Sequence, residues 1–495
     1  MKRLAAIMVF MILSASTGAA EDINFSDALK NAFEKNAEIK KAYADLKISK
    51  GTVEKTYSMF DLMFDGGVTY TEMKNNPANL LTPAEMNILA YNASLSNKIF
   101  TGGFLSLDLE STRQNMIYSG LDPMFSSFLG PDTTYEPSLS LSLMQPLLKG
   151  FWGRPDIKAI QIGEYTIKIA EQSLKQTVLA QVVSLRDAYF SVYMAEEMVK
   201  VQKKMLSDSR KFYNETLRLK KMGLRETKDV YQTEATLLTS EAKIKEAENQ
   251  AKFAREMFLN LAGFAKEKWN EINIIIDKEI KKAHVPEEMT EELEDTLADS
   301  QPELAILNYR REINEMTDEM AFADMLPELN IIGSYGLTSI GTDLGGALED
   351  MASNEYNNFT IGINLKYSFP NRANTGAKKE AEAKFEKAAE DYKFVRNMTK
   401  INIRDAYRKA AAAKNNYEKK KKAAALQSKR LKIEEKDFSQ GSSSTRELLM
   451  AQTDASTAKM SEITAYMEYI EAVNNWNKIT GVYNGYYDKY IKMKE

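Results

Sequence analysis

The tetrapeptide Arg186-Asp187-Ala188-Tyr189 occurs again as Arg404-Asp405-Ala406-Tyr407, 218 residues further along the chain. Two further pairs of landmarks have the same offset: Gly223 and Gly441, and the segments Leu261-Ala262-Gly263 and Ile479-Thr480-Gly481. Three landmarks in one register, inside long helical stretches, predict an internal duplication. A duplicated unit rarely buries its apolar face alone, so we expect it to pack against its own copy or against other subunits.

The N-terminus has the pattern of a signal peptide. The basic start Lys2-Arg3 precedes an apolar run from Leu4 to Leu13, and Gly18-Ala19-Ala20 supplies small residues for cleavage before Glu21. The apolar run is too short to anchor the chain in a membrane. We therefore predict that residues 1–20 direct export and are removed.

Composition argues against an enzyme. The 495 residues include no Cys and one His, His284, which excludes disulfides and thiolate sites and leaves little for zinc or a Ser-His-Asp triad. No glycine-rich phosphate loop is present, so we expect no catalytic activity and no cofactor. A net charge of −4, with both signs interspersed, does not suggest nucleic acid as a partner.

Two regions alternate with the period of amphipathic strands, 64–144 and 328–369. The first predicts four strands and the second two. Thr101-Gly102-Gly103 marks a tight turn inside the first region. The clearest apolar positions lie at alternate residues: Leu105, Leu107 and Leu109; Leu139, Leu141 and Leu143; Phe359, Ile361, Ile363 and Leu365.

A soluble, half-buried sheet would alternate in the same way. We favour strands of a membrane β-barrel because the polar face carries small or charged residues and aromatic residues lie near the predicted strand ends, as in an interfacial girdle. These aromatic residues are Phe64, Tyr70, Tyr91, Phe100, Phe104, Tyr135, Tyr356 and Phe369.

Each strand region is followed by a long helical hairpin. Pro146 and Pro370 end the strand patterns, since proline interrupts a ladder and lets the chain turn into a helix. The predicted hairpins cover 155–262 and 375–480, and helices of this length imply coiled-coil packing. Gly223 and Gly441 mark the reversals, where glycine closes a helix.

The elements arrange into two structural repeats. The first, 21–275, begins with a helix near Ser26, and the second, 276–481, begins with a helix from about Glu292 to Met325. Residues 482–495 form a C-terminal tail. Asn36-Ala37-Glu38-Ile39 aligns with Gln301-Pro302-Glu303-Leu304 at an offset of 265, so the first repeat carries 47 additional residues, which an inserted hairpin mostly explains.

This order of elements resembles the TolC-like outer-membrane efflux protein family over nearly the whole chain after the signal peptide. The motifs that carry the resemblance are Gln301-Pro302-Glu303-Leu304 in an opening helix, Leu326-Pro327-Glu328-Leu329 entering a strand, Gln145-Pro146-Leu147-Leu148 leaving one, and the tips Gly223…Asp229-Val230 and Gly441…Glu447-Leu448-Leu449. Each motif is weak by itself, whereas the whole order, found twice, is specific.

The resemblance implies an α+β membrane protein: a homotrimer whose shared transmembrane β-barrel is continuous with a long antiparallel coiled-coil α-helical tunnel in the periplasm. It implies an outer-membrane location in a Gram-negative-type bacterium, contact with outer-membrane lipid, and a passive exit duct for a tripartite efflux pump or type I secretion system. The implied partners are a periplasmic adaptor (membrane fusion) protein and an inner-membrane pump, whose RND, ABC or MFS type stays open.

The resemblance also assigns roles to the tips. It places Met222, Gly223, Leu224, Gly441, Ser442 and Ser443 at the adaptor-facing end. Glu447 matches a position where an acidic ring narrows the periplasmic mouth of characterised members, and three such carboxylates would attract cations. The second acid of some members is replaced by Met450, with Asp454 one turn further, so the chain departs from the double-ring pattern.

Two questions stay open. The family pattern is four strands per chain, whereas six are predicted here, so either the barrel is wider or the hairpin 92–113 lies outside it. The alternative function is a periplasmic coiled-coil adaptor or scaffold, although adaptors have one helical hairpin and this chain has two. The sequence does not identify the cargo.

Overall fold

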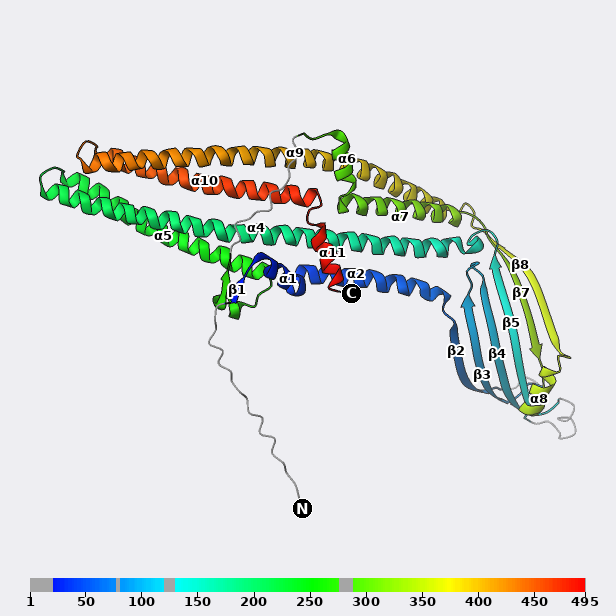
Figure 1. Ribbon diagram of the computed structural model, residues 1–495. Helices are drawn as coiled ribbons and strands as arrows, with labels where there is room; N and C mark the ends of the chain where they lie inside the picture. The colour runs from blue at the N-terminus through cyan, green and yellow to red at the C-terminus, as the bar shows by residue number, and fades with distance from the viewer. Residues whose placement is uncertain (1–20, 77–80, 120–129, 276–287, 495) are drawn as a thin grey trace, which may run out of the picture. The chain divides into compact units, whose positions relative to one another are not determined.

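The computed structural model describes residues 21–76, 81–119, 130–275 and 288–494, shown in Figure 1. The predicted signal peptide, residues 1–20, and His284 lie outside the described residues. The chain divides into two compact units. Of the described residues, 21–44, 172–275, 288–305 and 394–494 belong to unit 1, and those within 45–171 and 306–393 belong to unit 2.

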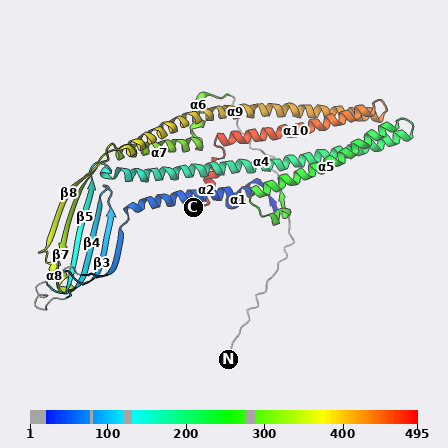
Figure 2. The same ribbon diagram turned by 180° about the vertical axis from the view of Figure 1, so that it is seen from behind.

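Unit 2 contains one antiparallel sheet of six strands in the order β2-β3-β4-β5-β7-β8, which Figures 1 and 2 show from its two sides. The predicted count of six is therefore confirmed for the described residues, and the inserted hairpin, β3 and β4, lies inside the sheet. The strands are β2 (Met63–Lys74), β3 (Glu85–Lys98), β4 (Phe104–Ile117), β5 (Thr133–Pro146), β7 (Glu328–Thr338) and β8 (Asn357–Lys366).

The register separates an apolar face from a polar face. Residues that pair across an antiparallel ladder lie on the same face, and alternate residues lie on opposite faces. One row of paired residues is Phe64, Leu95, Leu107, Leu141, Tyr335 and Phe359. The neighbouring row, on the opposite face, is Asp65, Ser94, Asp108, Ser140, Gly336 and Asn358.

The strands extend beyond the segments in which the alternation is regular. Tyr91, predicted near a strand end, pairs with Val68 and Ser111 in the middle of its strand. Polar residues such as Gln114 and Asn115 continue the ladder because strand pairing satisfies their backbone whatever the side chain. The connection after β7 also contains α8 (Leu344–Ala352), which was not predicted; Asp343 caps it by accepting from the Gly346 amide at 2.9 Å.

Four long helices form two hairpins, α4 with α5 and α9 with α10 (Figure 1). The outward helices each have 68 residues and the returning helices 35, and every boundary of one hairpin is 218 residues from its counterpart in the other. At 1.5 Å per residue, each outward helix is about 100 Å long. Their bounds are α4 Arg154–Lys221, α5 Thr227–Leu261, α9 Arg372–Ser439 and α10 Thr445–Ile479.

Each opening helix, expected to be continuous, is two helices. The first breaks at Asn36, between α1 (Phe25–Lys35) and α2 (Ala37–Tyr57), and the second at Ser300-Gln301, between α6 (Glu291–Asp299) and α7 (Pro302–Asp324). The side-chain amide of Asn36 donates to the Leu261 carbonyl at 3.3 Å, and the side-chain amide of Gln301 donates to the Ile479 carbonyl at 2.9 Å. The two breaks therefore supply caps for the ends of α5 and α10, whose last carbonyls have no helical partner.

The core of unit 1 surrounds the first copy of the repeated tetrapeptide. Tyr189 is 2% exposed, donates to the Ile275 carbonyl at 2.7 Å and packs against Phe258. The 482–495 tail contains α11 (Asn484–Lys492), whose Tyr490 packs on Phe33 with ring centroids 5.3 Å apart. A short parallel pair, β1 (Glu21–Ile23) with β6 (Ile272–Ile274), completes the unit. Among the described residues, no helix is both long and apolar enough to cross a membrane.

Candidate functional site

The two hairpin tips in unit 1 have the same backbone geometry. Gly223 and Gly441 both adopt a left-handed conformation, with φ of 76° and 80°. In each tip the residue after the glycine donates its amide back across the turn, from Leu224 to the Leu219 carbonyl and from Ser442 to the Asp437 carbonyl, both at 3.0 Å. This is a glycine-terminated helix end, in which an L side chain would be strained.

The tips present a mixed surface to solvent. Met222 is 53% exposed and Leu224 is 65% exposed, while Gly223, Gly441 and Ser442 are also exposed. Ser443 differs: it is 7% exposed, and its hydroxyl donates to Glu434. Of the six residues predicted to contact an adaptor, five therefore lie on the exposed surface and Ser443 is turned inward.

Arg225 joins the two tips, a role that the sequence reasoning missed. Its guanidinium donates to the Ser443 carbonyl at 2.6 Å and lies 4.8 Å from the ring centroid of Phe438. Residues 225 and 443 are themselves related by the 218-residue offset, so equivalent positions of the two tips are in contact. The sequence carried a signal for this contact. At the 218-residue offset the two tips differ, with an arginine at position 225 and a serine at the equivalent position 443.

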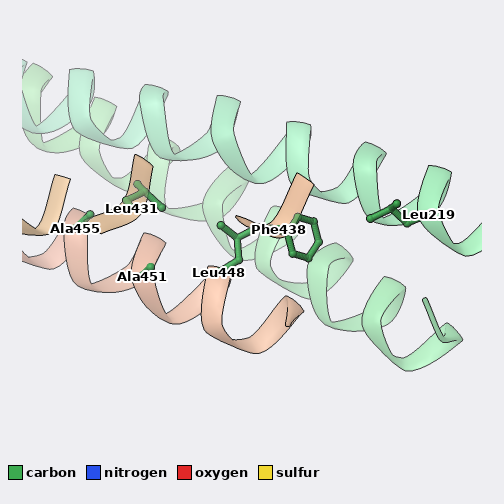
Figure 3. Close-up of a cluster of buried hydrophobic side chains, with 6 residues drawn as sticks. All are labelled: Leu219, Leu431, Phe438, Leu448, Ala451 and Ala455. Carbon is green, nitrogen blue, oxygen red and sulfur yellow. The ribbon is translucent and has the colours of Figure 1, made fainter. Parts of the chain in front are cut away.

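Behind the tips lies an apolar cluster, drawn in Figure 3. It joins α4, α9 and α10, so the first hairpin packs on both helices of the second. All six members are buried, at 8% exposed or less, and their burial holds the ends of three long helices together. The cluster consists of Leu219, Leu431, Phe438, Leu448, Ala451 and Ala455.

Glu447 completes a capping box at the start of α10, in which Ser444 is the N-cap residue. Its carboxylate accepts from the Ser444 amide and hydroxyl, both at 2.8 Å, while the Glu447 amide donates to the Ser444 hydroxyl at 3.2 Å. These hydrogen bonds from the Ser444 backbone and side chain lower the pKa of Glu447, so it is ionised at neutral pH. The side chain is exposed, which leaves its charge facing solvent at the tip.

Asp454, the second candidate acid, is paired within the chain. Its carboxylate accepts from Arg430 at 2.8 Å, so its charge is largely offset by a cation of α9. Asp454 is thus a poorer candidate for a bare acidic ring than Glu447.

Behind the apolar cluster, buried polar side chains of α4, α5 and α10 are hydrogen-bonded to one another. Ser209 of α4, 1% exposed, bonds the Ser240 hydroxyl at 3.1 Å and accepts from the Gln452 amide at 3.2 Å. Beside it, a pocket of about 490 Å³ lies between α4, α9 and α10. Among the carboxylates that line it, burial raises the pKa of Asp208, and burial together with the negative charge of Asp208 raises the pKa of Glu435.

The strand-to-helix junctions of unit 2 contain both predicted swivel prolines. Pro146 is the last residue of β5, paired with Asn330, and Pro370 lies between β8 and α9. Before α4 the chain turns through Gly150, Trp152 and Gly153, all with positive φ. The turn 101–103 of the inserted hairpin packs here, since Gln145 accepts from the Thr101 hydroxyl and donates to the Thr101 carbonyl, both at 2.8 Å.

Comparison with known proteins identifies the class. The Outer membrane efflux protein family matches residues 104–263 and 296–482, well over half of the chain. No curated protein sequence matches this chain. The structure is similar to the Campylobacter jejuni CmeC outer membrane channel, with a TM-score of 0.69 at 14% identity, covering 92% of this chain and 85% of that one.

Two other solved channels have the same fold. The outer membrane protein VceC of Vibrio cholerae gives a TM-score of 0.68 at 14% identity, covering 92% of this chain and 96% of that one. The open-state MtrE outer membrane channel of Neisseria gonorrhoeae gives 0.64 at 13% identity, covering 94% and 93%.

The fold, a strand sheet with two long helical hairpins, is that of a TolC-like channel. The chain belongs to the Outer membrane efflux protein family. It is accordingly a transport protein of the outer membrane with an efflux-channel role, and its helical part lies in the periplasm.

Proposed function

We propose that the chain is the passive exit duct of a tripartite efflux pump or a type I secretion system, assembled as a homotrimer from an internally duplicated protomer. The observation that carries this proposal is the pair of hairpins with equal lengths and a constant offset of 218 residues. Two matched hairpins per chain give a ring of alternating, nearly equivalent helix pairs when copies assemble about one axis.

The exposed tips are the proposed docking surface for a periplasmic adaptor. Met222 and Leu224 place apolar side chains on an exposed turn, and Ser442 adds a hydroxyl on the neighbouring tip. An inner-membrane pump would deliver cargo through that adaptor. A periplasmic adaptor or scaffold is the competing function, but the family match and the apolar outer row of the sheet both favour the channel.

We further propose that three Glu447 carboxylates surround the axis and form a cation-attracting mouth. The exposure and the lowered pKa of Glu447 support this role, because the charge is present at neutral pH. Glu447 is also part of the capping box of α10, so an experiment has to distinguish the effect of losing the charge from the effect of losing the capping hydrogen bonds.

The substitution Glu447→Gln makes that separation. Glutamine at this helix position also fits a capping box, so the fold is kept while the charge is lost. We expect single channels in planar bilayers to show a higher basal conductance or a lower preference for K⁺ over Cl⁻. The matched control is Asp229→Asn, which removes the equivalent acid of the first tip, where Asp229 accepts from the Glu226 amide at 3.1 Å.

A second control tests the cap alone. Ser444→Ala removes the hydroxyl and costs about 1 kcal/mol of helix stability while the Glu447 charge stays. If Glu447→Gln leaves conductance and selectivity unchanged, or if Ser444→Ala changes selectivity as much, the gate role of Glu447 is wrong. Native mass spectrometry of the purified protein tests the trimer, since any other copy number contradicts it.

A further inference from the structure

Both outer strands of the unit 2 sheet are open along one side. In the part of the chain that the structure describes, β2 pairs only with β3 and β8 only with β7. Neither strand contains proline. β8 carries one charged residue, Lys366, at its last position, whereas β2 carries Asp65, Glu72 and Lys74. The β8 edge therefore lacks the usual protections of a solvent-exposed edge, and in lipid each unpaired backbone group of either edge costs several kcal/mol.

The apolar side chains of the edge strands are also more exposed than those of the centre. On β8, Phe359, Ile361 and Ile363 are 69–74% exposed, and on β2 Phe64 is 69% exposed. In the central strands β4, β5 and β7, the large apolar residues of the same face are at most 48% exposed. The more exposed of them, at 38–48%, are Leu105, Leu107, Leu109, Leu141, Leu143, Ile331 and Tyr335. A neighbouring strand on each open side would remove this difference.

The strand directions fix which edges can pair. All five ladders are antiparallel, so β2 and β8, the first and last of six strands, run in opposite directions. The β8 edge of one copy can therefore join the β2 edge of the next and continue the antiparallel pattern. Six strands alone are fewer than the eight of the smallest membrane barrels, so one chain cannot close the sheet by itself.

We infer that β2 of one copy pairs with β8 of the next, and that the six-stranded sheets close an eighteen-stranded barrel, wider than the four-strand family pattern gives. This inference rests on the proposed homotrimer. Barrel diameter grows roughly linearly with strand number, so the bore is about one and a half times that of a twelve-stranded barrel.

The inserted hairpin is an integral part of this wall. β3 and β4 pair over fourteen residues, and β4 pairs with β5 over twelve. Glycines let its turn pack closely against the junction before α4: a Cβ at Gly153 would lie 2.2 Å from the Phe100 carbonyl oxygen, and one at Gly102 would lie 2.7 Å from the Gly150 carbonyl oxygen. A hairpin lying outside the sheet would need neither ladder nor this contact.

The inward face suits a water-filled bore. It carries small polar residues along neighbouring strands, and barrels of 16 to 18 strands leave an aqueous channel rather than a packed core. The cargo class that fits is therefore hydrated and polar, and large enough to use the added width. The small residues are Ser94, Ser106, Ser138, Ser140, Ser142, Thr360 and Gly362.

Because the chain has no native Cys, cysteine pairs can test the seam directly. Ile361→Cys on β8 is combined in turn with Phe64→Cys, Gly66→Cys, Val68→Cys and Tyr70→Cys on β2. We expect one combination to give disulfide-linked dimers and trimers in outer membranes on a non-reducing gel, because paired strands place Cα atoms within disulfide range. The control is Leu141→Cys with Tyr335→Cys, paired within one chain, which should give no oligomer.

Electron microscopy of the purified protein, viewed along the axis, gives the second readout. Eighteen strands, with a barrel about one and a half times as wide as a twelve-stranded one, is the expected result. A trimer with a twelve-stranded barrel, or the absence of any β2–β8 cross-link between copies, overturns the inference while leaving the proposed exit duct intact. A complex that is not a trimer overturns the proposed assembly as well.

Discussion

The repeated Arg-Asp-Ala-Tyr sequence has different surroundings in its two copies. Arg186 is 8% exposed and lies over the rings of Phe25, Phe190 and Tyr483, whereas Arg404 is paired with Glu294. The arginines of the tetrapeptide therefore make contacts that pack the helices together. The environment of each copy was not readable from the sequence, because it depends on which helices pack around it.

Asp187 makes the stability of unit 1 depend on pH. Burial raises its pKa to about 6, with the nearby Glu471 adding to the shift, although the Asn474 amide donates to it at 2.6 Å. A raised carboxyl pKa means that the folded state holds the proton more tightly, so stability is lost as pH rises from about 4 to about 6. We expect Asp187→Asn to stabilise the protein above pH 7 by about 1–2 kcal/mol, after allowing for solvent screening.

Thermal unfolding of the detergent-solubilised protein at pH 4 and pH 8 measures this effect. Asp187→Asn should raise the melting temperature at pH 8 and leave it nearly unchanged at pH 4. Asp405→Asn, the equivalent substitution in the second copy, is the control, because Asp405 is paired with Lys409 at 2.8 Å. An equal shift in both variants would contradict the assignment to Asp187.

Arg225 is predicted to hold the second tip in place. Arg225→Ala removes a charged hydrogen bond to Ser443 and a cation–π contact with Phe438, together worth about 1–2 kcal/mol at this partly exposed site. We expect amide hydrogen exchange over residues 436–448 to become about tenfold faster. Arg210→Ala, which removes only the Arg210–Glu241 pair within the first hairpin, should leave exchange in that segment unchanged.

At the scale of elements, periodicity predicted the strand regions and the long hairpins. The hairpin bounds agree with the structure within three residues, because glycine ends and helical spacing are local signals. The breaks at Asn36 and Gln301 were missed, since each depends on a distant carbonyl that its amide reaches. The strand ends were missed for the same reason: a partner strand continues the ladder after the apolar alternation stops.

Gly153 should be the most sensitive position of the strand-to-helix junction. An alanine there combines a φ of 66° with a Cβ 2.2 Å from the Phe100 carbonyl oxygen, so the inserted hairpin must move. We expect Gly153→Ala to cost more than about 2 kcal/mol and to reduce the yield of assembled trimer in outer membranes.

Gly223→Ala is the matched control for that experiment. Gly223 also has a positive φ, of 76°, but nothing lies within 4 Å of an added Cβ, so only the backbone strain of about 1 kcal/mol remains. Equal assembly of both variants would show that the turn of the inserted hairpin does not depend on its contact with Gly153.

At the scale of the whole molecule, function depends on surfaces that one chain leaves incomplete. The sheet has an apolar face, a polar face and two open edges, and the exposed tips present five of the six residues expected to meet an adaptor. The family resemblance pointed to Glu447 as a candidate site residue. Its hydrogen bonds to Ser444 and the contact of Arg225 with Ser443 became visible only in the folded tips. The class of transporter was predictable from element order, whereas the cargo depends on partners that the chain does not encode.

Single-channel recording of the purified protein in planar bilayers tests the central proposal, a passive water-filled exit duct, most directly. We predict discrete conductance steps without nucleotide or any other protein, small in the wild type and larger in Glu447→Gln. A correctly assembled protein that inserts into the bilayer but produces no conductance steps in either form would contradict it.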